Sequence, residues 1–284
     1  MGNESIADTI PTPQDLARTY NLYGRDDAWD AVEEYRAVMQ SSANHPDKKS
    51  HALSKIVDLP RSRIRTWMDE GGMPDPVRAI QVAETRGLLI RDRDTPAGAA
   101  FAGLIAWIFS GGSIRTEFYD PYFALDRSAQ ERSQAALETL AGVFDLPLRV
   151  NDREAGRAIE LVPAEDGSVV GRCLATAGAP VGDKSAHSLR LPAWIQTGPE
   201  RVQRLFTHVY LANRGVYGGD GEVLQLRESP RPKRFHEELA TLFETVAGRG
   251  TVTASASHVR ADQTATEELT TLLIRDTKQL LEGR

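Results

Sequence analysis

The chain has 284 residues, of which 40% are hydrophobic, and it carries a formal net charge of −6. This composition is typical of a folded protein with a sizeable core and excludes global disorder. The longest apolar run, around residues 99–109, is too short for a transmembrane helix, and no basic segment followed by an apolar one opens the chain. Cys173 is the single cysteine, which excludes an internal disulfide and a cysteine-based zinc site. We therefore expect a cytoplasmic protein that makes no contact with a membrane.

The first part of the chain predicts a small helical domain. Residues 27–40 carry apolar side chains at helical spacing, and a polar loop follows over residues 41–49. Two short helices are expected within residues 53–68, and a longer one over residues 74–89, where a proline precedes the helix and a glycine ends it. The charged stretch at residues 90–98, broken by proline and glycine, is expected to link this domain to the next.

The segment "LSKIVDLPRSRIRTWM" (residues 53–68) predicts two short amphipathic helices around a tight turn. Ile64, Trp67 and Met68 of the second helix would point inward, and Pro60 suits the start of that helix. The segment resembles the helix-turn-helix of many prokaryotic regulators. Asp58 stands where those proteins often carry glycine.

The same segment is locally basic although the whole chain is acidic. Between Lys48 and Arg65 six lysine and arginine side chains face one aspartate, a local net charge of +5. Arginine can contact guanine edges in the major groove, and basic side chains neutralise phosphates. The predicted DNA-binding residues are Lys55, Arg61, Ser62, Arg63, Arg65 and Thr66. The alternative is an ordinary surface helix with solvated arginines.

After the linker, helices alternate with pairs of strand candidates. Helices are expected at residues 97–110, 128–144, 200–213, 233–246 and 266–283. Strands are expected at residues 113–119, 122–127, 156–163, 168–177, 215–219, 222–228 and 251–259, with a hairpin turn at Asp166-Gly167. This order predicts an α+β protein: an all-α helix-turn-helix domain (residues 1–94), then a duplicated αββαββ unit with repeats at residues 97–195 and 196–284.

The stretch "LIAWIFSGGSI" (residues 104–114) is apolar and then turns abruptly at two glycines. It resembles the LAGLIDADG motif in its common form "LAGLIDGDGSI". The matching residues are Leu104, Ile108, Gly112, Ser113 and Ile114. "VYLANRGVY" (residues 209–217) falls in the same register, with Gly215 at the place of Gly112. The resemblance to this homing-endonuclease family spans roughly residues 97–284.

The resemblance implies that two motif helices pack against each other and that each glycine turn feeds a strand of a DNA-cradling sheet. Nucleases of the family carry an acid just before the motif glycine, and the two acids hold divalent metals. Gly111 and Arg214 occupy those positions here. Glycine has no ligand atom, and arginine repels a cation. We therefore expect no catalytic residue, no metal site, no cofactor and no enzymatic activity.

The sheet surface of the second part is a further candidate for DNA contacts. In residues 251–259 Thr251, Thr253 and Ser255 alternate with apolar residues and would share one face. Arg115 lies in a predicted strand and would add a phosphate contact, as would Arg127, Arg172 and Arg227. The alternative is a solvated sheet face without a ligand.

These patterns together predict a sequence-specific DNA-binding protein, a transcriptional regulator, whose partner is double-stranded DNA. A protein partner or a homodimer stays open. Two alternatives remain: an active homing-type endonuclease that cuts double-stranded DNA with Mg²⁺, and a protein-interaction module. The six histidines show no metal-ligand spacing, and no nucleophile motif is present.

Overall fold

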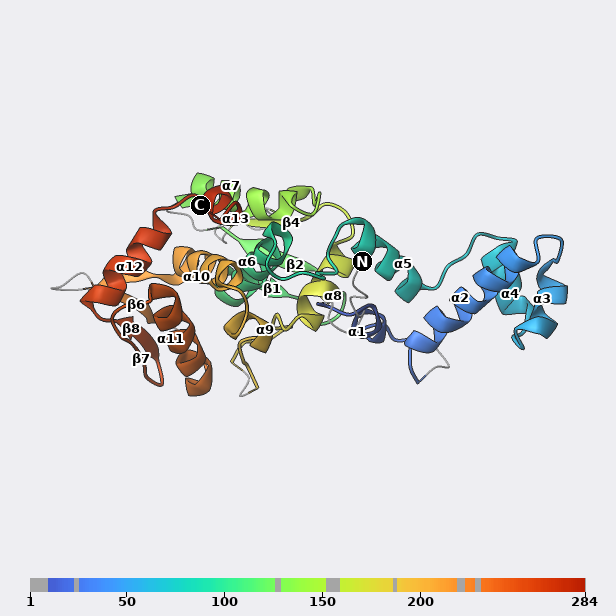
Figure 1. The fold of residues 1–284 in the computed structure, drawn as a ribbon, viewed down its shortest axis with the longest axis horizontal. Helices are drawn as coiled ribbons and strands as arrows, with labels where there is room; N and C mark the ends of the chain where they lie inside the picture. Colours follow the sequence, from blue (N-terminus) through green and yellow to red (C-terminus); the bar gives the residue numbers. More distant parts are fainter. Residues whose placement is uncertain are drawn as a thin grey trace.

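The computed structural model describes residues 10–22, 26–125, 129–151, 159–185, 188–218, 223–227 and 231–283. It contains helices and small antiparallel sheets. Three helices, α2 (Trp29–Asn44), α3 (Ser50–Ile56) and α4 (Arg61–Met68), project from one end of a larger body that holds both sheets (Figure 1). Within the described residues, no helix combines the length and apolar character that crossing a membrane requires.

The projecting helices enclose a small core of their own. Val38, Leu53 and Ile64, one from each helix, are fully buried together and form a cluster separate from the main core. Asp58 in the turn between α3 and α4 has a φ of 52°. This left-handed conformation favours glycine, and aspartate is among the few other residues that tolerate it. The conformation explains why aspartate can stand at position 58, where glycine is common in the turns that this segment resembles.

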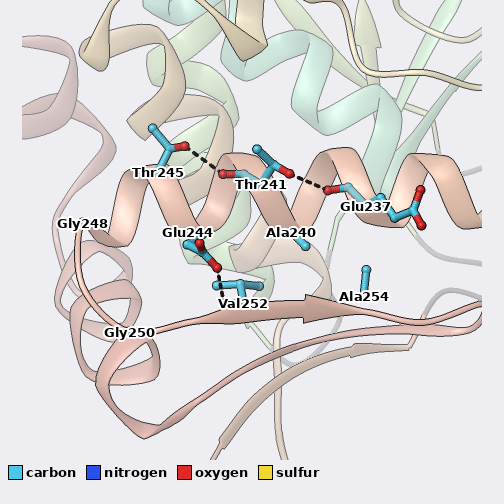
Figure 2. Close-up of a pocket in the computed structure, with 9 residues that line it drawn as sticks. All are labelled: Glu237, Ala240, Thr241, Glu244, Thr245, Gly248, Gly250, Val252 and Ala254. Atoms are coloured by element: carbon cyan, nitrogen blue, oxygen red, sulfur yellow. Dashed lines mark hydrogen bonds between the residues drawn. The ribbon is translucent and has the colours of Figure 1, made fainter.

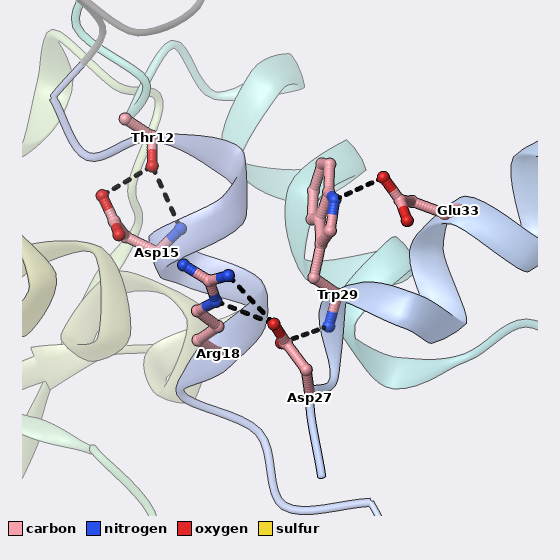
Figure 3. A network of polar contacts seen from close by, with 6 residues as sticks. All are labelled: Thr12, Asp15, Arg18, Asp27, Trp29 and Glu33. Atoms are coloured by element: carbon pink, nitrogen blue, oxygen red, sulfur yellow. Dashed lines mark hydrogen bonds and ion pairs between the residues drawn. The ribbon is translucent and has the colours of Figure 1, made fainter. Parts of the chain in front are cut away.

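Helices α1 (Pro13–Arg18) and α5 (Asp75–Thr85) flank the projecting unit and pack on the body. Leu16 of α1 and Ile80 of α5 are buried in the main core rather than in the small one. Figure 3 shows how α1 is joined to the start of α2: the Arg18 guanidinium donates two hydrogen bonds to the Asp27 carboxylate, at 2.9 and 3.1 Å. Asp27 also accepts from the backbone N–H of Trp29, and both interactions lower the pKa of Asp27. The contact joins the end of α1 to the residues just before α2.

The body contains two four-stranded antiparallel sheets with the same arrangement. The strands of the first are β1 (Gly112–Ile114), β2 (Pro121–Ala124), β3 (Leu148–Asn151) and β4 (Glu160–Pro163). Those of the second are β5 (Val216–Gly218), β6 (Val223–Arg227), β7 (Val252–Ala254) and β8 (His258–Ala261). The spatial orders are β1-β2-β4-β3 and β5-β6-β8-β7. In each sheet a hairpin therefore precedes a helix, and the next two strands join the same sheet.

Helices cover these sheets and meet at the centre of the body. They are α6 (Pro96–Gly111), α7 (Gln130–Gly142), α8 (Gly167–Thr176), α9 (Ala193–Gln196), α10 (Glu200–Arg214), α11 (Lys233–Ala247), α12 (Gln263–Leu273) and α13 (Thr277–Leu281). α6 is buried at every residue from Gly98 to Ser110, and it packs along α10 (Figure 1). Gly103 allows a close approach, since a Cβ there would lie 3.0 Å from Leu140 and 3.5 Å from Leu205. The apolar character of the opening half of "LIAWIFSGGSI" follows from this central position.

The strand predicted at residues 168–177 is wrong, because this segment forms helix α8. Its buried residues, Val170, Cys173, Leu174 and Ala177, follow helical spacing, which the β-branched pair Val169-Val170 obscured. Asp166 has a φ of 53° and stands at the N-cap of α8, so Asp166-Gly167 starts a helix instead of a hairpin. β4 pairs with β2 and with β3, and the sequence pattern did not indicate β3.

Two further predictions at the C-terminal end need correction. Residues 251–259 form no single strand: β7 ends at Ala254, and a turn leads into β8. The helix predicted over residues 266–283 is divided into α12 and α13. Asp276 ends the continuity because its side chain accepts a hydrogen bond from the backbone of Lys278 and it forms a capping box with Gln279.

Replacing Gly171 by alanine will destabilise the protein by about 1–3 kcal/mol, the usual cost of forcing extra volume into a packed core. A Cβ at Gly171 of α8 would lie 1.6 Å from the carbonyl oxygen of Tyr119, so the backbone must move. Gly142→Ala is the matched control, because a Cβ there meets no atom within 4 Å. Urea denaturation of both variants tests the packing of α8. Equal stability of Gly171→Ala and the parent chain would contradict it.

Candidate nucleic-acid interface

Helix α4 presents a polar face to solvent. Arg61, Ser62, Arg65 and Thr66 are exposed, while Ile64 is fully buried. Lys55, at the end of α3, is also exposed. Tyr35 of α2 contacts Trp67 edge-to-face, with ring centroids 5.5 Å apart, so the inner face of α4 is held against α2. The outer face is therefore rigidly supported and basic.

Two of the predicted arginines form ion pairs with glutamates of the same unit. Arg63 is half-buried and lies 2.8 Å from Glu34 of α2. Arg65 lies 2.8 Å from Glu70, and its side chain keeps 60% of its surface exposed. Exposed ion pairs of this kind contribute little to stability. Arg63 thus lies at the margin of the face, whereas Arg65 stays accessible beside a competing carboxylate.

The candidate residues on the second sheet are not equivalent. Thr251 and Thr253 are exposed, and Thr253 donates to the carbonyl oxygen of Arg260 at 3.3 Å. Ser255 is half-buried in the β7–β8 turn, where its hydroxyl oxygen accepts hydrogen bonds from the backbone N–H groups of Ser257 and His258. The expectation that Ser255 shares the strand face with the threonines is therefore wrong. The Ser255 hydroxyl is instead hydrogen-bonded to the backbone of its own turn.

Arg260 is an exposed cation on this surface that the sequence pattern missed. It lies on β8 directly opposite Thr253 and beside Gln225 of β6. The predicted strand ended at Val259, so Arg260 was left outside it. The alternation of buried Val259 and Ala261 around an exposed residue is the signal that would have found it.

The other arginines assigned to strands have different surroundings. Arg115 follows β1, pairs with Asp120 at 2.7 Å and lies over the ring of Tyr122. Arg172 is in helix α8, so its predicted place in a strand is wrong, and its guanidinium lies over the rings of Tyr20 and Tyr119. Arg127 lies outside the described residues, and so does the side chain of Arg227.

A hollow of about 650 Å³ lies between α11 and the edge strand β7 (Figure 2). Glu237 and Glu244 line it from the helix, and Glu244 accepts a hydrogen bond from the backbone N–H of Val252 at 2.8 Å. The carboxylate thereby satisfies a donor of the edge strand. Phosphates are repelled by this acidic side, so the hollow is no candidate for DNA binding.

The ends of α6 and α10 meet at a polar tip. The Asn213 side-chain amide of α10 donates to the Ser110 hydroxyl oxygen of α6 at 2.9 Å, and Gly111 lies beside Asn213. Arg214 donates to the carbonyl oxygen of Ser110. Gly111 and Arg214 thus lie together at the paired helix ends, and Arg214 acts as a cap of α6.

Two further cations cap α6, and the sequence pattern indicated neither. Lys184 donates to the carbonyl oxygens of Ile108 and Gly112, and Arg231 donates to that of Phe109 at 2.7 Å. The last carbonyl groups of a helix have no partner within it and carry partial negative charge. Basic side chains from three separate segments therefore stabilise the end of a helix that is buried along most of its length.

Among the residues that the structure describes at the tip, the donor set does not fit a divalent metal. Of the described carboxylates, Glu160 lines a cavity of about 560 Å³ there, together with Asn213 and Arg214, and it accepts a hydrogen bond from Asn151. Mg²⁺ prefers an octahedral set of oxygens, and the Arg214 guanidinium opposes a cation. In the described part of the chain no three histidine, cysteine or acidic side chains come close enough to hold a metal.

No model of a known protein family matches the chain, and no curated protein matches it. Two similar solved structures are a crystal structure of I-DmoI in complex with DNA and Mn and a structure of mesophilic variants of the homing endonuclease I-DmoI. The first has a TM-score of 0.43 and 11% identity, and the match covers 63% of this chain and 98% of I-DmoI. The second has the same score and identity, with 64% and 99% covered.

This comparison corrects one prediction. The sequence pattern led to the expectation that the chain is not an enzyme, because Gly111 and Arg214 replace the two acids of the motif. The structures to which the chain is similar are those of a homing endonuclease. The exclusion of enzymatic activity is therefore withdrawn.

Proposed function

We propose that this protein binds double-stranded DNA in a sequence-specific way and acts as a transcriptional regulator. Residues 1–94 supply a helix-turn-helix, and residues 97–195 and 196–284 supply two LAGLIDADG-like repeats. Helix α4 enters the major groove, and the body adds contacts to the phosphate backbone. The single observation that carries the proposal is the exposed basic face of α4 on a unit with its own core.

The geometry of α3 and α4 supports this role. A recognition helix needs a buried inner face and side chains on its outer face that reach base edges. Ile64 anchors α4, while Arg61, Ser62 and Arg65 extend into solvent. The unit projects from the body (Figure 1), so a duplex can approach α4 from outside. Lys55 at the end of α3 adds positive charge beside this face.

The body supports a second, sequence-independent contact. Thr251, Thr253 and Arg260 are exposed on the second sheet, and Arg115 is exposed beside the first. Hydroxyl and guanidinium groups of this kind bond phosphate oxygens and fix the register of a protein on DNA without reading its sequence. The side of α11 that carries Glu237 and Glu244 repels phosphates and makes no such contact.

Selection from a pool of random duplexes tests the proposal. The full chain should enrich a defined motif, and the logarithm of its affinity should fall linearly with the logarithm of the salt concentration. A pool that stays random after repeated rounds, or binding without salt dependence, would contradict the proposal and favour a protein-interaction module. Incubation of the selected duplex with Mg²⁺ measures separately whether the bound DNA is cut.

Glu70→Gln should strengthen binding to the selected duplex by about two- to fivefold, because exposed ion pairs are worth up to about 1 kcal/mol. The substitution releases Arg65 from its ionic partner and removes a negative charge beside the proposed DNA face. Glu268→Gln breaks a comparable pair with Arg249 on the body and serves as the control. Fluorescence anisotropy gives both affinities. Equal or weaker binding by Glu70→Gln would show that Arg65 does not approach DNA.

A further inference from the structure

A cavity of about 870 Å³ lies between α7, the C-terminal part of α10 and the junction of α12 with α13. This volume is within the range of sites that bind small molecules. Apart from Arg132, the side chains of α7 that line it are small, among them Ala135 and Ala136, and this leaves the space open. Trp107 of α6 and Leu211 of α10 give it an apolar lining. No residue of α4 lines the cavity, and Asn213 lines both this cavity and the one at the tip of α6 and α10.

Polar contacts hold the wall of the cavity in place. Arg132 of α7 donates to the carbonyl oxygen of Leu273 at 2.7 Å. His208 of α10 is buried, and its Nδ1 lies 3.2 Å from the carbonyl oxygen of Leu272. Burial lowers the pKa of His208 to about 4, so the ring is neutral at pH 7 and Nδ1–H donates this bond. The α12–α13 junction is thereby tied to both α7 and α10.

The charged residues around the cavity favour an anion. Among the described residues, Arg132 and Arg275 line it, against one carboxylate, that of Asp276. Asp276 is engaged with the backbone N–H of Lys278 at the start of α13. A guanidinium binds carboxylates through paired hydrogen bonds. A ligand with an acidic end and an apolar remainder would match both the charges and the lining.

The ends of the two central helices differ in how they are covered. Around the end of α6, Lys184 and Arg231 donate to carbonyl oxygens of the helix. Around the end of α10, the cavity reaches Asn213 and Gly215. The cavity of about 560 Å³ adjoins the end of α6, where these cations lie, and the cavity of about 870 Å³ adjoins the end of α10. The larger of the two volumes is the one with more room for a ligand.

We propose that this cavity binds a small organic carboxylate with an apolar body. Arg132 and Arg275 contact the carboxylate, and Trp107 and Leu211 contact the apolar body. The apolar part of the ligand replaces water along the small side chains of α7. The negative charge of its carboxylate is matched by the guanidinium groups of Arg132 and Arg275. The site does not depend on DNA binding, and its test needs no DNA.

Isothermal titration calorimetry of the full chain with octanoate, and with octanamide as its neutral analogue, tests this site. Octanoate should bind saturably and at least tenfold more tightly than octanamide. Ala136→Phe fills the cavity and should weaken octanoate binding at least tenfold, while Gln130→Phe, at an exposed position of the same helix, should leave it unchanged. Arg275→Gln should weaken octanoate binding and spare octanamide.

Circular dichroism of each variant controls for folding. Should Ala136→Phe fail to fold, the affinities of Arg275→Gln for octanoate and octanamide test the proposal instead, because this substitution adds no volume to the cavity. Equal affinities for octanoate and octanamide, no binding of either, or octanoate binding that survives Ala136→Phe in a folded protein would each overturn the proposal.

Discussion

Replacing Arg61 and Arg65 together by alanine will weaken binding to the preferred duplex by about 2–6 kcal/mol, since one arginine contact to a guanine is worth roughly 1–3 kcal/mol. Both side chains are exposed on the outer face of α4, and neither contributes to the core around Ile64. The loss should be confined to specific binding. Affinity for a scrambled duplex should fall far less, because the remaining cations still neutralise phosphates.

The control is a pair of arginines outside the unit, of which Arg204 is 32% exposed and Arg249 is 72% exposed. Arg204→Ala and Arg249→Ala remove two charges from surface ion pairs on the body. Fluorescence anisotropy with the selected and the scrambled duplex compares both double variants. An equal loss for the two double variants would mean that net charge, rather than α4, governs binding.

Replacing Phe109 by alanine will lower the free energy of unfolding by about 3–5 kcal/mol, the usual cost of truncating a buried phenylalanine. Phe109 is fully buried at the end of α6. Its ring stacks on Phe235 of α11 at 5.4 Å and contacts Phe206 of α10 edge-to-face at 6.1 Å. Deleting it leaves a cavity where three helices of the body meet.

Urea denaturation measures this effect, with Phe118→Ala as the control. The side chain of Phe118 is 53% exposed, so its truncation should change stability by less than about 0.5 kcal/mol. A loss below about 1 kcal/mol for Phe109→Ala would contradict the central packing of α6, because core truncations of aromatic residues cost more than that.

Helices with a clear apolar stripe were predictable from the sequence. α10 and α11 lie within a few residues of their predicted ranges. So does α6, which is buried on all sides from Gly98 to Ser110. The segment around Val170 was predicted as a strand and is a helix, because β-branched residues masked its helical spacing. Strand β3 was not predicted, because its four residues show no alternation of buried and exposed side chains.

The candidate DNA interface was predictable where a single helix carries it. The outward side chains of α4 follow from the helical period and from the burial of Ile64. The contacts at the tip of α6 were not predictable, because Lys184, Arg214 and Arg231 reach it from distant segments. Only the fold brings those cations together. For the same reason the aromatic partners of Arg172 could not be read from the sequence.

The central claim, that arginines of α4 contact guanine edges in the major groove, is tested most directly with 7-deazaguanine. This base lacks the N7 acceptor that arginine uses. Substituted in the selected duplex, it should weaken the binding of the parent chain at one or more positions. The variant Arg61→Ala with Arg65→Ala should lose nothing further at those positions. An equal loss for both proteins at every position would contradict the claim.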